Sequence, residues 1–217
     1  MARIARIVIP RYPHHVTQRG NRRQQTFFNQ ADYQYYFDLL VEAGQKAEVE
    51  FWAYCLMPNH VHLVVVPENE DGLAALFKDA HRRYTRHINF RKHWRGHLWQ
   101  ERFHSFVMDE NYLLATVRYT ELNPVRAGLC EKPEQWKWSS VHAHLAGKDD
   151  ELIRVSPLLE RISNWEAYLL ENATTNDFDI IRQHTKTGRP IQSDQFLSEL
   201  QILTGNDYRR GKPGRKI

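Results

Sequence analysis

Cysteine is scarce in this chain, and long apolar segments are absent. The 217 residues include only Cys55 and Cys130, too few and too far apart for a disulfide framework or a thiolate metal site. This scarcity is typical of a reducing compartment. No window of about 18 consecutive apolar residues exists, and residues 1–10 do not resemble a secretion signal. We therefore expect a soluble, cytoplasmic protein without a membrane partner.

Acidic residues are also missing from parts of the chain, which leaves three basic blocks. Residues 1–30 hold six arginines and no acid, residues 78–104 hold eight Lys or Arg against two acids, and residues 182–217 hold eight against three. The segments between them are net acidic, and the whole chain has a formal charge of +4. Such sorting is typical of a surface for a polyanion, most often nucleic acid. Basic faces that only balance acidic ones in solvent are the alternative.

The apolar content is sufficient for one main core. Hydrophobic residues make up 41% of the sequence, and nothing in the composition indicates general disorder. After Gly147 the chain becomes richer in Gly, Pro and Arg, although a helical pattern recurs at residues 194–203. We therefore predict a main domain at residues 1–150 and a helical, basic C-terminal extension at residues 151–217.

Apolar periodicity predicts elements in the order β-α-β-β-α-β-α. Strands are expected at residues 14–19, 51–57, 60–66 and 102–108, and helices at residues 32–46, 71–90 and 110–123. Asp109 is a candidate N-cap for the last helix, and Pro124 is expected to stop it. The hairpin of the second and third strands is apolar on both faces, which predicts a central position in the sheet. The pattern favours an α+β fold with helices on a mainly antiparallel sheet, of the split β-α-β type.

Two histidines stand at the start of the apolar run P-N-H-V-H-L-V-V-V-P. Side chains alternate along a strand, so His60 and His62 point to one face and Val61 to the other. Buried imidazoles need partners, and two on one face suit a divalent metal. Histidines held only by hydrogen bonds are equally compatible with this spacing.

The last predicted helix offers a third metal ligand and a nucleophile. Tyr119 and Asn123 are four residues apart and therefore share a helix face. The side-chain carbonyl oxygen of asparagine can bind a metal. A phenol beside a metal-bound phosphate can attack the phosphorus, which predicts phosphoryl transfer to tyrosine. The alternative for Tyr119 is a core tyrosine, and Tyr112, two turns earlier on the same face, is a rival nucleophile.

These motifs resemble the HUH-type single-tyrosine transposases of the IS200-like superfamily, and most closely the branch associated with repetitive extragenic palindromes (REP). The resemblance covers about residues 14–140 and rests on P-N-H-V-H-L-V-V, W-Q-E-R-F-H-S, Y-L-L-A-T-V-R-Y-T-E-L-N-P-V-R-A-G-L and W-K-W-S-S in that order. It implies a ferredoxin-like domain that uses Mg²⁺ or Mn²⁺ to cut single-stranded DNA at the foot of an imperfect hairpin. Cleavage would leave a 5′-phosphotyrosine and a free 3′-hydroxyl.

The resemblance also assigns roles to individual residues. It implies that His60, His62 and Asn123 bind the metal and that Tyr119 is the nucleophile. Related insertion-sequence enzymes often carry glutamine in place of Asn123. The family includes monomers and homodimers, and both states are compatible with this chain. The alternatives are a domesticated hairpin-binding regulator that does not cut DNA and an initiator of replication or mobilisation.

Basic residues in the three blocks are the predicted DNA contacts. They are Arg19, Arg22, Arg23, Arg82, Arg83, Arg86, Arg102, Arg209, Arg210 and Lys212. The first three lie in a donor-rich loop, and the resemblance implies that N-terminal segments help to read the bases that flank the hairpin. A surface ion pair is the alternative for Arg102, and a solvated tail is the alternative for the last three.

Overall fold

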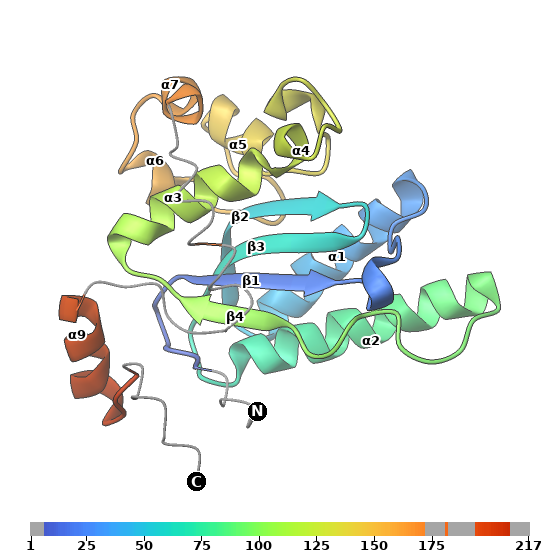
Figure 1. Cartoon of the computed structure of the whole chain (residues 1–217), viewed down its shortest axis with the longest axis horizontal. Coiled ribbons are helices and arrows are strands. Elements are labelled where there is room, and N and C mark those ends of the chain that lie inside the picture. The colour runs from blue at the N-terminus through green and yellow to red at the C-terminus, as the bar shows by residue number, and fades with distance from the viewer. Residues whose placement is uncertain (1–6, 172–180, 182–193, 209–217) are drawn as a thin grey trace, which may run out of the picture.

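A four-stranded antiparallel sheet forms the centre of the computed structural model, in the order β2-β3-β1-β4 (Figure 1). The structure describes residues 7–171, 181 and 194–208. The strands are β1 (His14–Arg19), β2 (Val49–Met57), β3 (His60–Pro67) and β4 (His104–Val107). This strand order is that of a ferredoxin-like fold, which confirms the predicted α+β class.

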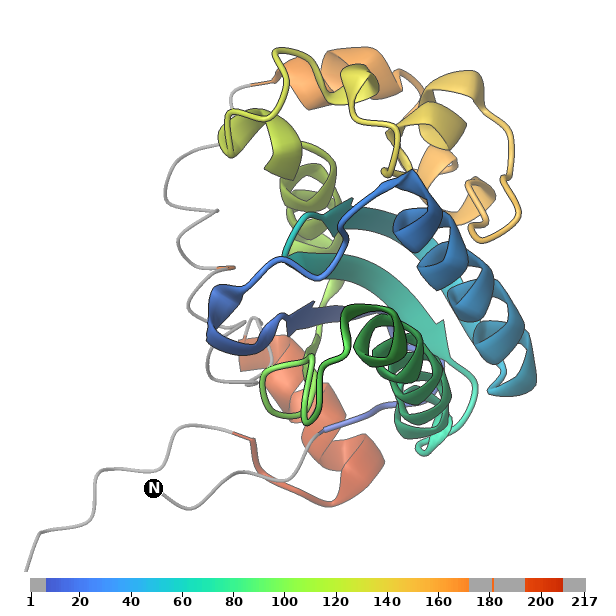
Figure 2. The same ribbon diagram turned by 90° about the vertical axis from the view of Figure 1, so that its right-hand side faces the viewer.

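Helices cover both faces of the sheet. They are α1 (Gln30–Lys46), α2 (Gly72–Lys92), α3 (Glu110–Glu121), α4 (Asn123–Arg126), α5 (Val141–Ala146), α6 (Ser156–Leu159), α7 (Trp165–Leu170) and α9 (Asp194–Thr204), with 3-10 turns η1 (Asn21–Arg23) and η2 (Pro133–Gln135). Figures 1 and 2 show α1 and α2 side by side on one face and α3 on the other. The helices α6 and α7 pack beside α3.

Alternation along β3 sorts its side chains between the two layers. Val61, Leu63 and Val65 join the core beneath α1 and α2, whereas Val64 packs into the core beneath α3. His60 and His62 therefore share the face of Val64 and point toward α3. The predicted separation of the two histidines from Val61 is confirmed.

The predicted hairpin of β2 and β3 is confirmed, but the central position predicted for it is wrong for β2, which lies at an edge of the sheet. Both faces of β2 are apolar because helices cover both faces of the sheet. Apolar faces therefore do not distinguish an edge strand from a central strand. Loops bond to its outer edge instead. The Leu56 amide donates to the Trp138 carbonyl at 2.9 Å, and the Ser140 amide donates to the Tyr54 carbonyl at 3.0 Å. The edge of β2 is thus protected from pairing with another chain.

The end of the predicted catalytic helix differs from expectation in one respect. Asp109 caps α3 as predicted, since its side chain accepts from the Tyr112 amide at 3.0 Å. However, α3 ends at Glu121, and Pro124 lies in the first turn of the short helix α4 rather than terminating a continuous helix. Proline is tolerated there because a first-turn amide has no helical acceptor. Asn123 consequently begins a new turn beside the last turn of α3.

The described part beyond residue 150 packs onto the rest of the fold. Trp165 and Leu169 of α7 join the core beneath α3, and Phe196 and Leu200 of α9 pack against Ile9. The helical pattern at residues 194–203 corresponds to α9. The predicted DNA contacts Arg209, Arg210 and Lys212 lie outside the described residues. Within the described ranges, no helix combines the length and apolar character needed to cross a membrane.

Candidate active site

The candidate site lies at the end of the sheet where β3 begins. In the antiparallel register, His60 faces Arg19 of β1 on one side and Met57 of β2 on the other. Directly opposed residues of an antiparallel pair point to the same face. The side chain of Arg19 therefore projects beside His60 on the face that carries α3.

The structure brings together the four residues predicted to carry the chemistry. The Asn123 amide nitrogen lies 3.1 Å from Nε2 of His62. The Tyr119 ring meets the His62 ring edge to face at 5.3 Å between centroids, and His60 and His62 are 4.9 Å apart by the same measure. Tyr119 is only 7% exposed and Asn123 only 8%. Residues from β3, α3 and α4 thus form one compact cluster.

Both histidines of β3 are neutral at physiological pH. Burial, with a smaller contribution from Arg19, lowers the pKa of His60 to about 4. Burial is also the main cause that holds the pKa of His62 well below its usual value, and the neighbouring His60 adds to it. Nδ1 of His60 lies 2.7 Å from the Asn59 side-chain oxygen and donates to it, which leaves a lone pair on Nε2. Neutral imidazole with a free nitrogen is the form that binds metals.

The donor set fits a weakly held divalent cation. Two imidazole nitrogens and one amide offer three ligands, because rotation of the Asn123 amide exchanges its oxygen and nitrogen. Among the described residues, no group of three or more His, Cys, Asp or Glu is placed to hold a metal. A three-ligand site leaves coordination positions open for phosphate oxygens and water, as is usual for Mg²⁺.

Two arginines lie close to Tyr119. The guanidinium carbon of Arg126 is 4.8 Å from the centre of the Tyr119 ring. Desolvation and the charge of Arg23 lower the pKa of Arg19, and the Tyr119 phenol opposes this shift, so these side chains are within electrostatic range. Arg126 was not among the predicted residues, although it follows Tyr119 by only seven positions. Positive charge on this face suits a phosphate group.

The rival tyrosine lies elsewhere on α3. Tyr112 is in the first turn of the helix and Tyr119 is in the last, so roughly 10 Å of helix separates them. Tyr112 packs beside the core beneath α3, whereas Tyr119 contacts the ring of His62. The geometry thus favours Tyr119 as the nucleophile.

The loop after β1 presents the predicted arginines at the same end of the sheet. Arg22 and Arg23 are exposed and adopt left-handed backbone conformations, with φ of 54° and 61°. The Asn59 side chain fixes the loop by donating to the Arg23 carbonyl at 3.0 Å. A Cβ on Gly20 would lie 2.3 Å from the Gln24 carbonyl oxygen, so only glycine allows this close turn. Consecutive left-handed residues are strained, and such strain is concentrated at functional sites.

The predicted arginines of α2 lie on the opposite layer. Arg83 pairs with Glu42 at 2.7 Å and with Asp79 at 3.3 Å, and Arg82 also pairs with Asp79. Arg86 is exposed on the same helix. Because α2 covers the face away from His60, the structure does not bring these arginines to the cluster. Arg102 is exposed in the segment before β4.

A buried carboxylate anchors the helix that carries Tyr119. Glu121 is fully buried and accepts three hydrogen bonds: from Ser140 Oγ at 2.6 Å, His144 Nδ1 at 2.6 Å and Trp165 Nε1 at 2.8 Å. Sequence patterns did not predict this network, since its members are up to 44 residues apart. No local pattern indicated it, because the last turn of α3 also contains Arg118 and Thr120. The network ties the end of α3 to α5 and α7.

Replacing Glu121 with glutamine tests this anchor. The amide would turn an NH₂ group toward at least one N–H or O–H donor, so at least one buried hydrogen bond is lost. We expect the free energy of unfolding in urea to fall by about 1–3 kcal/mol. Glu131→Gln, an exposed glutamate in the following loop, is the matched control and should change it by less than about 0.5 kcal/mol. Equal stability of the two variants would contradict the anchoring role.

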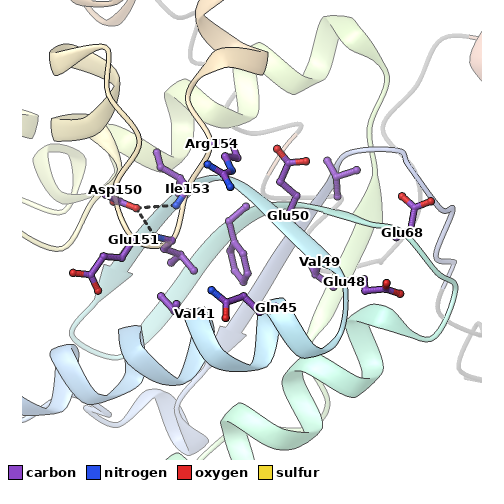
Figure 3. A pocket seen from close by; sticks show the side chains of 14 residues that line it. Val41, Gln45, Glu48, Val49, Glu50, Glu68, Asp150, Glu151, Ile153 and Arg154 are labelled. Atoms are coloured by element: carbon purple, nitrogen blue, oxygen red, sulfur yellow. Dashed lines mark hydrogen bonds between the residues drawn. The ribbon is translucent and has the colours of Figure 1, made fainter.

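A separate cleft of about 510 Å³ opens at the other end of the hairpin, between α1, the start of β2 and residues 150–154 (Figure 3). Four glutamates line it: Glu48, Glu50, Glu68 and Glu151. The one arginine in its wall, Arg154, already pairs with Asp149 at 2.8 Å. The acidic lining disfavours a polyanion, so this cleft is not a candidate DNA-binding groove.

Comparison with known proteins identifies relatives of this chain. The sequence model of the family described as "Transposase IS200 like" matches residues 9–123, a range that contains all four residues of the cluster. The REP-associated tyrosine transposase of Escherichia coli K12 is 24% identical over 127 residues, which cover 58% of this chain and 73% of that protein. A Haemophilus influenzae protein with the provisional name REP-associated tyrosine transposase is 31% identical over 101 residues. That alignment covers 42% of this chain and 57% of the relative.

The fold is similar to a solved structure. A REP-associated tyrosine transposase bound to a REP hairpin superposes with a TM-score of 0.59 and 22% sequence identity. The match covers 71% of this chain and 92% of the other. At this level of identity the likeness establishes the fold, and the chemistry must be argued from the cluster of side chains.

Proposed function

Since the chain belongs to the IS200-like transposase family, we propose that it is a tyrosine transposase that cuts and rejoins single-stranded DNA beside REP hairpins. The observation that carries the proposal is the contact of the Tyr119 ring with His62, 5.3 Å between centroids, beside Asn123 and His60. The relatives are named as REP-associated tyrosine transposases, and one of them is bound to a REP hairpin, which supports the hairpin substrate.

The reaction is a transfer of a phosphoryl group to Tyr119. The phenolic oxygen attacks the scissile phosphorus and forms a 5′-phosphotyrosine ester while the bond from phosphorus to the 3′-oxygen breaks. The phenol loses its proton to solvent, and the departing 3′-oxygen gains one. Because the number of phosphoester bonds is unchanged, a 3′-hydroxyl can attack the phosphotyrosine and rejoin DNA without ATP.

The residues around Tyr119 have distinct tasks. Nε2 of His60, Nε2 of His62 and the Asn123 side-chain oxygen would hold Mg²⁺ or Mn²⁺. When bound, such an ion withdraws charge from a phosphate oxygen and stabilises the pentacoordinate transition state. Arg126 adds positive charge beside the phenol.

Exposed arginines of the loop after β1 would bind the phosphates of the hairpin foot. We expect Arg22→Ala and Arg23→Ala each to reduce the slope of log affinity against log salt by about 0.7 to 0.9, because each removes one phosphate contact. Fluorescence anisotropy with a labelled hairpin at several salt concentrations measures this slope. Arg83→Ala is the matched control, since its charge is already paired with Glu42 and Asp79. If Arg83→Ala reduces the salt slope as much as Arg22→Ala and Arg23→Ala do, the DNA is not bound at the loop after β1.

The decisive experiment for the proposed function is detection of a covalent protein–DNA adduct. Incubation with Mg²⁺ or Mn²⁺ and a labelled hairpin that carries a single-stranded extension should give an adduct that survives denaturation. A hairpin-binding regulator without cleavage activity would bind the same DNA and form none.

A further inference from the structure

A third histidine lies against the proposed metal ligands. His15 of β1 is fully buried, and its Nε2 is 3.0 Å from Nδ1 of His62. The two rings are nearly parallel, with an interplanar angle of 6° and centroids 5.2 Å apart. Phe106 meets the His15 ring edge-on at 5.0 Å, which restricts its rotation.

The hydrogen bonds of His15 differ from those of its neighbour His14. Nδ1 of His15 is buried and has no hydrogen-bond partner among the described residues. Its neighbour His14 uses both nitrogens: Nδ1 donates to the Tyr12 carbonyl at 2.7 Å, and Nε2 accepts from the Ile9 amide at 3.1 Å. His15 thus leaves one buried nitrogen unsatisfied, at a cost in free energy, while it bonds to His62.

One proton lies between the two imidazoles, and its position decides what His62 can do. If His15 donates, neutral His62 must carry its own proton on Nε2, which then has no lone pair for a cation. If Nδ1 of His62 donates to His15, Nε2 is free. The Asn123 amide nitrogen lies 3.1 Å from Nε2 of His62, and with the amide in this orientation Nε2 accepts, which corresponds to the second arrangement.

We propose that His15 is a positioning residue whose Nε2 accepts a hydrogen bond from the Nδ1–H of His62. This bond keeps the proton of His62 on Nδ1 and leaves the Nε2 lone pair free toward Asn123 and the metal. The metal in this statement rests on the proposed function, whereas the proton arrangement does not. Groups that hold the second nitrogen of a ligating histidine fix its tautomer and orientation. His15 does so from β1, the strand that pairs with β3, which carries His62.

The proton arrangement can be measured without metal or DNA. Long-range ¹⁵N–¹H NMR spectra of the full chain should show the Nδ1–H form of His62 in the wild type. His15→Phe removes the acceptor and should populate the Nε2–H form. His15→Gln, whose side-chain oxygen can accept in place of Nε2, should restore the wild-type form. His81→Phe is the matched control, because His81 lies on α2, on the face of the sheet away from His62, and is bonded to Tyr36 of α1.

Metal affinity gives the second readout. By calorimetric titration of the full chain with Mn²⁺, His15→Phe should bind about 10- to 100-fold more weakly than the wild type, the usual effect of losing such a partner. His15→Gln and His81→Phe should bind within a few-fold of the wild type, and unfolding curves identify any variant that fails to fold.

Two results would overturn the proposal. One is a wild-type His62 that carries its proton on Nε2, which needs no variant to fold. The other is a folded His15→Phe with wild-type tautomer and Mn²⁺ affinity. If the wild type binds no Mn²⁺ but the His62 tautomer still depends on His15, the positioning role stands and the metal in the proposed function falls.

Discussion

Tyr119→Phe is expected to abolish the covalent protein–DNA adduct, whereas Tyr112→Phe should form it in wild-type amounts. Phenylalanine keeps the ring contact with His62, 5.3 Å between centroids in the wild type, and removes only the attacking oxygen. Tyr112 cannot substitute for it, because roughly 10 Å of helix separates the two positions. Denaturing gels of reactions with a labelled hairpin and its single-stranded extension give the adduct yield directly.

The two tyrosines control for each other. Both substitutions remove one hydroxyl from α3, so a general effect on the helix would reduce the adduct in both variants. Hairpin affinity should stay close to the wild-type value in each. An adduct that persists in Tyr119→Phe and disappears in Tyr112→Phe would show that the nucleophile is wrongly assigned.

The second large effect concerns the histidines of β3. His60→Ala and His62→Ala should each abolish cleavage, and removal of divalent cations with EDTA should have the same effect on the wild type. Hairpin affinity should change by less than about tenfold, or about 1.4 kcal/mol, because the arginines proposed to bind the phosphates are unchanged. Cleavage and binding are measured on the same hairpin, by gel and by anisotropy.

His142→Ala is the matched control for these variants. His142 is exposed, and its Nε2 bonds to the Trp136 carbonyl, so its removal should leave cleavage and binding unchanged. If His60→Ala and His62→Ala lose binding and cleavage to the same extent, the histidines are structural and the metal assignment fails.

Local patterns in the sequence predicted much of the fold. The strand expected at residues 14–19 is β1, and the helix expected at residues 32–46 forms most of α1. Alternation of side chains placed His60 and His62 on one face, and four-residue spacing placed Tyr119 and Asn123 together. The first inference succeeded because it depends on geometry within a single strand. Asn123 lies beside His62 although α3 ends at Glu121 and Asn123 begins α4. The roles of these residues came from the family resemblance.

The parts that the sequence did not predict depend on contacts between distant segments. His15 reaches His62 across 47 residues, through the pairing of β1 with β3. Glu121 accepts hydrogen bonds from three residues in two later segments, α5 with its N-cap and α7. The edge position of β2 was mispredicted for the same reason, since apolar faces report the helices above and below a strand and not its lateral neighbours. No short window of sequence contains this information.

The acidic cleft gives the molecule a charge asymmetry along its strands. Glu48 and Glu68 lie where β2 begins and β3 ends, whereas Arg22 and Arg23 lie by the turn at the opposite end of the hairpin. Such a molecule has an electric dipole. The electric field of a nucleic acid would turn the end that carries Arg22 and Arg23 toward the phosphates before contact. The glutamates repel approach from the wrong end. Encounters would therefore begin with Tyr119 already oriented toward the strand to be cut.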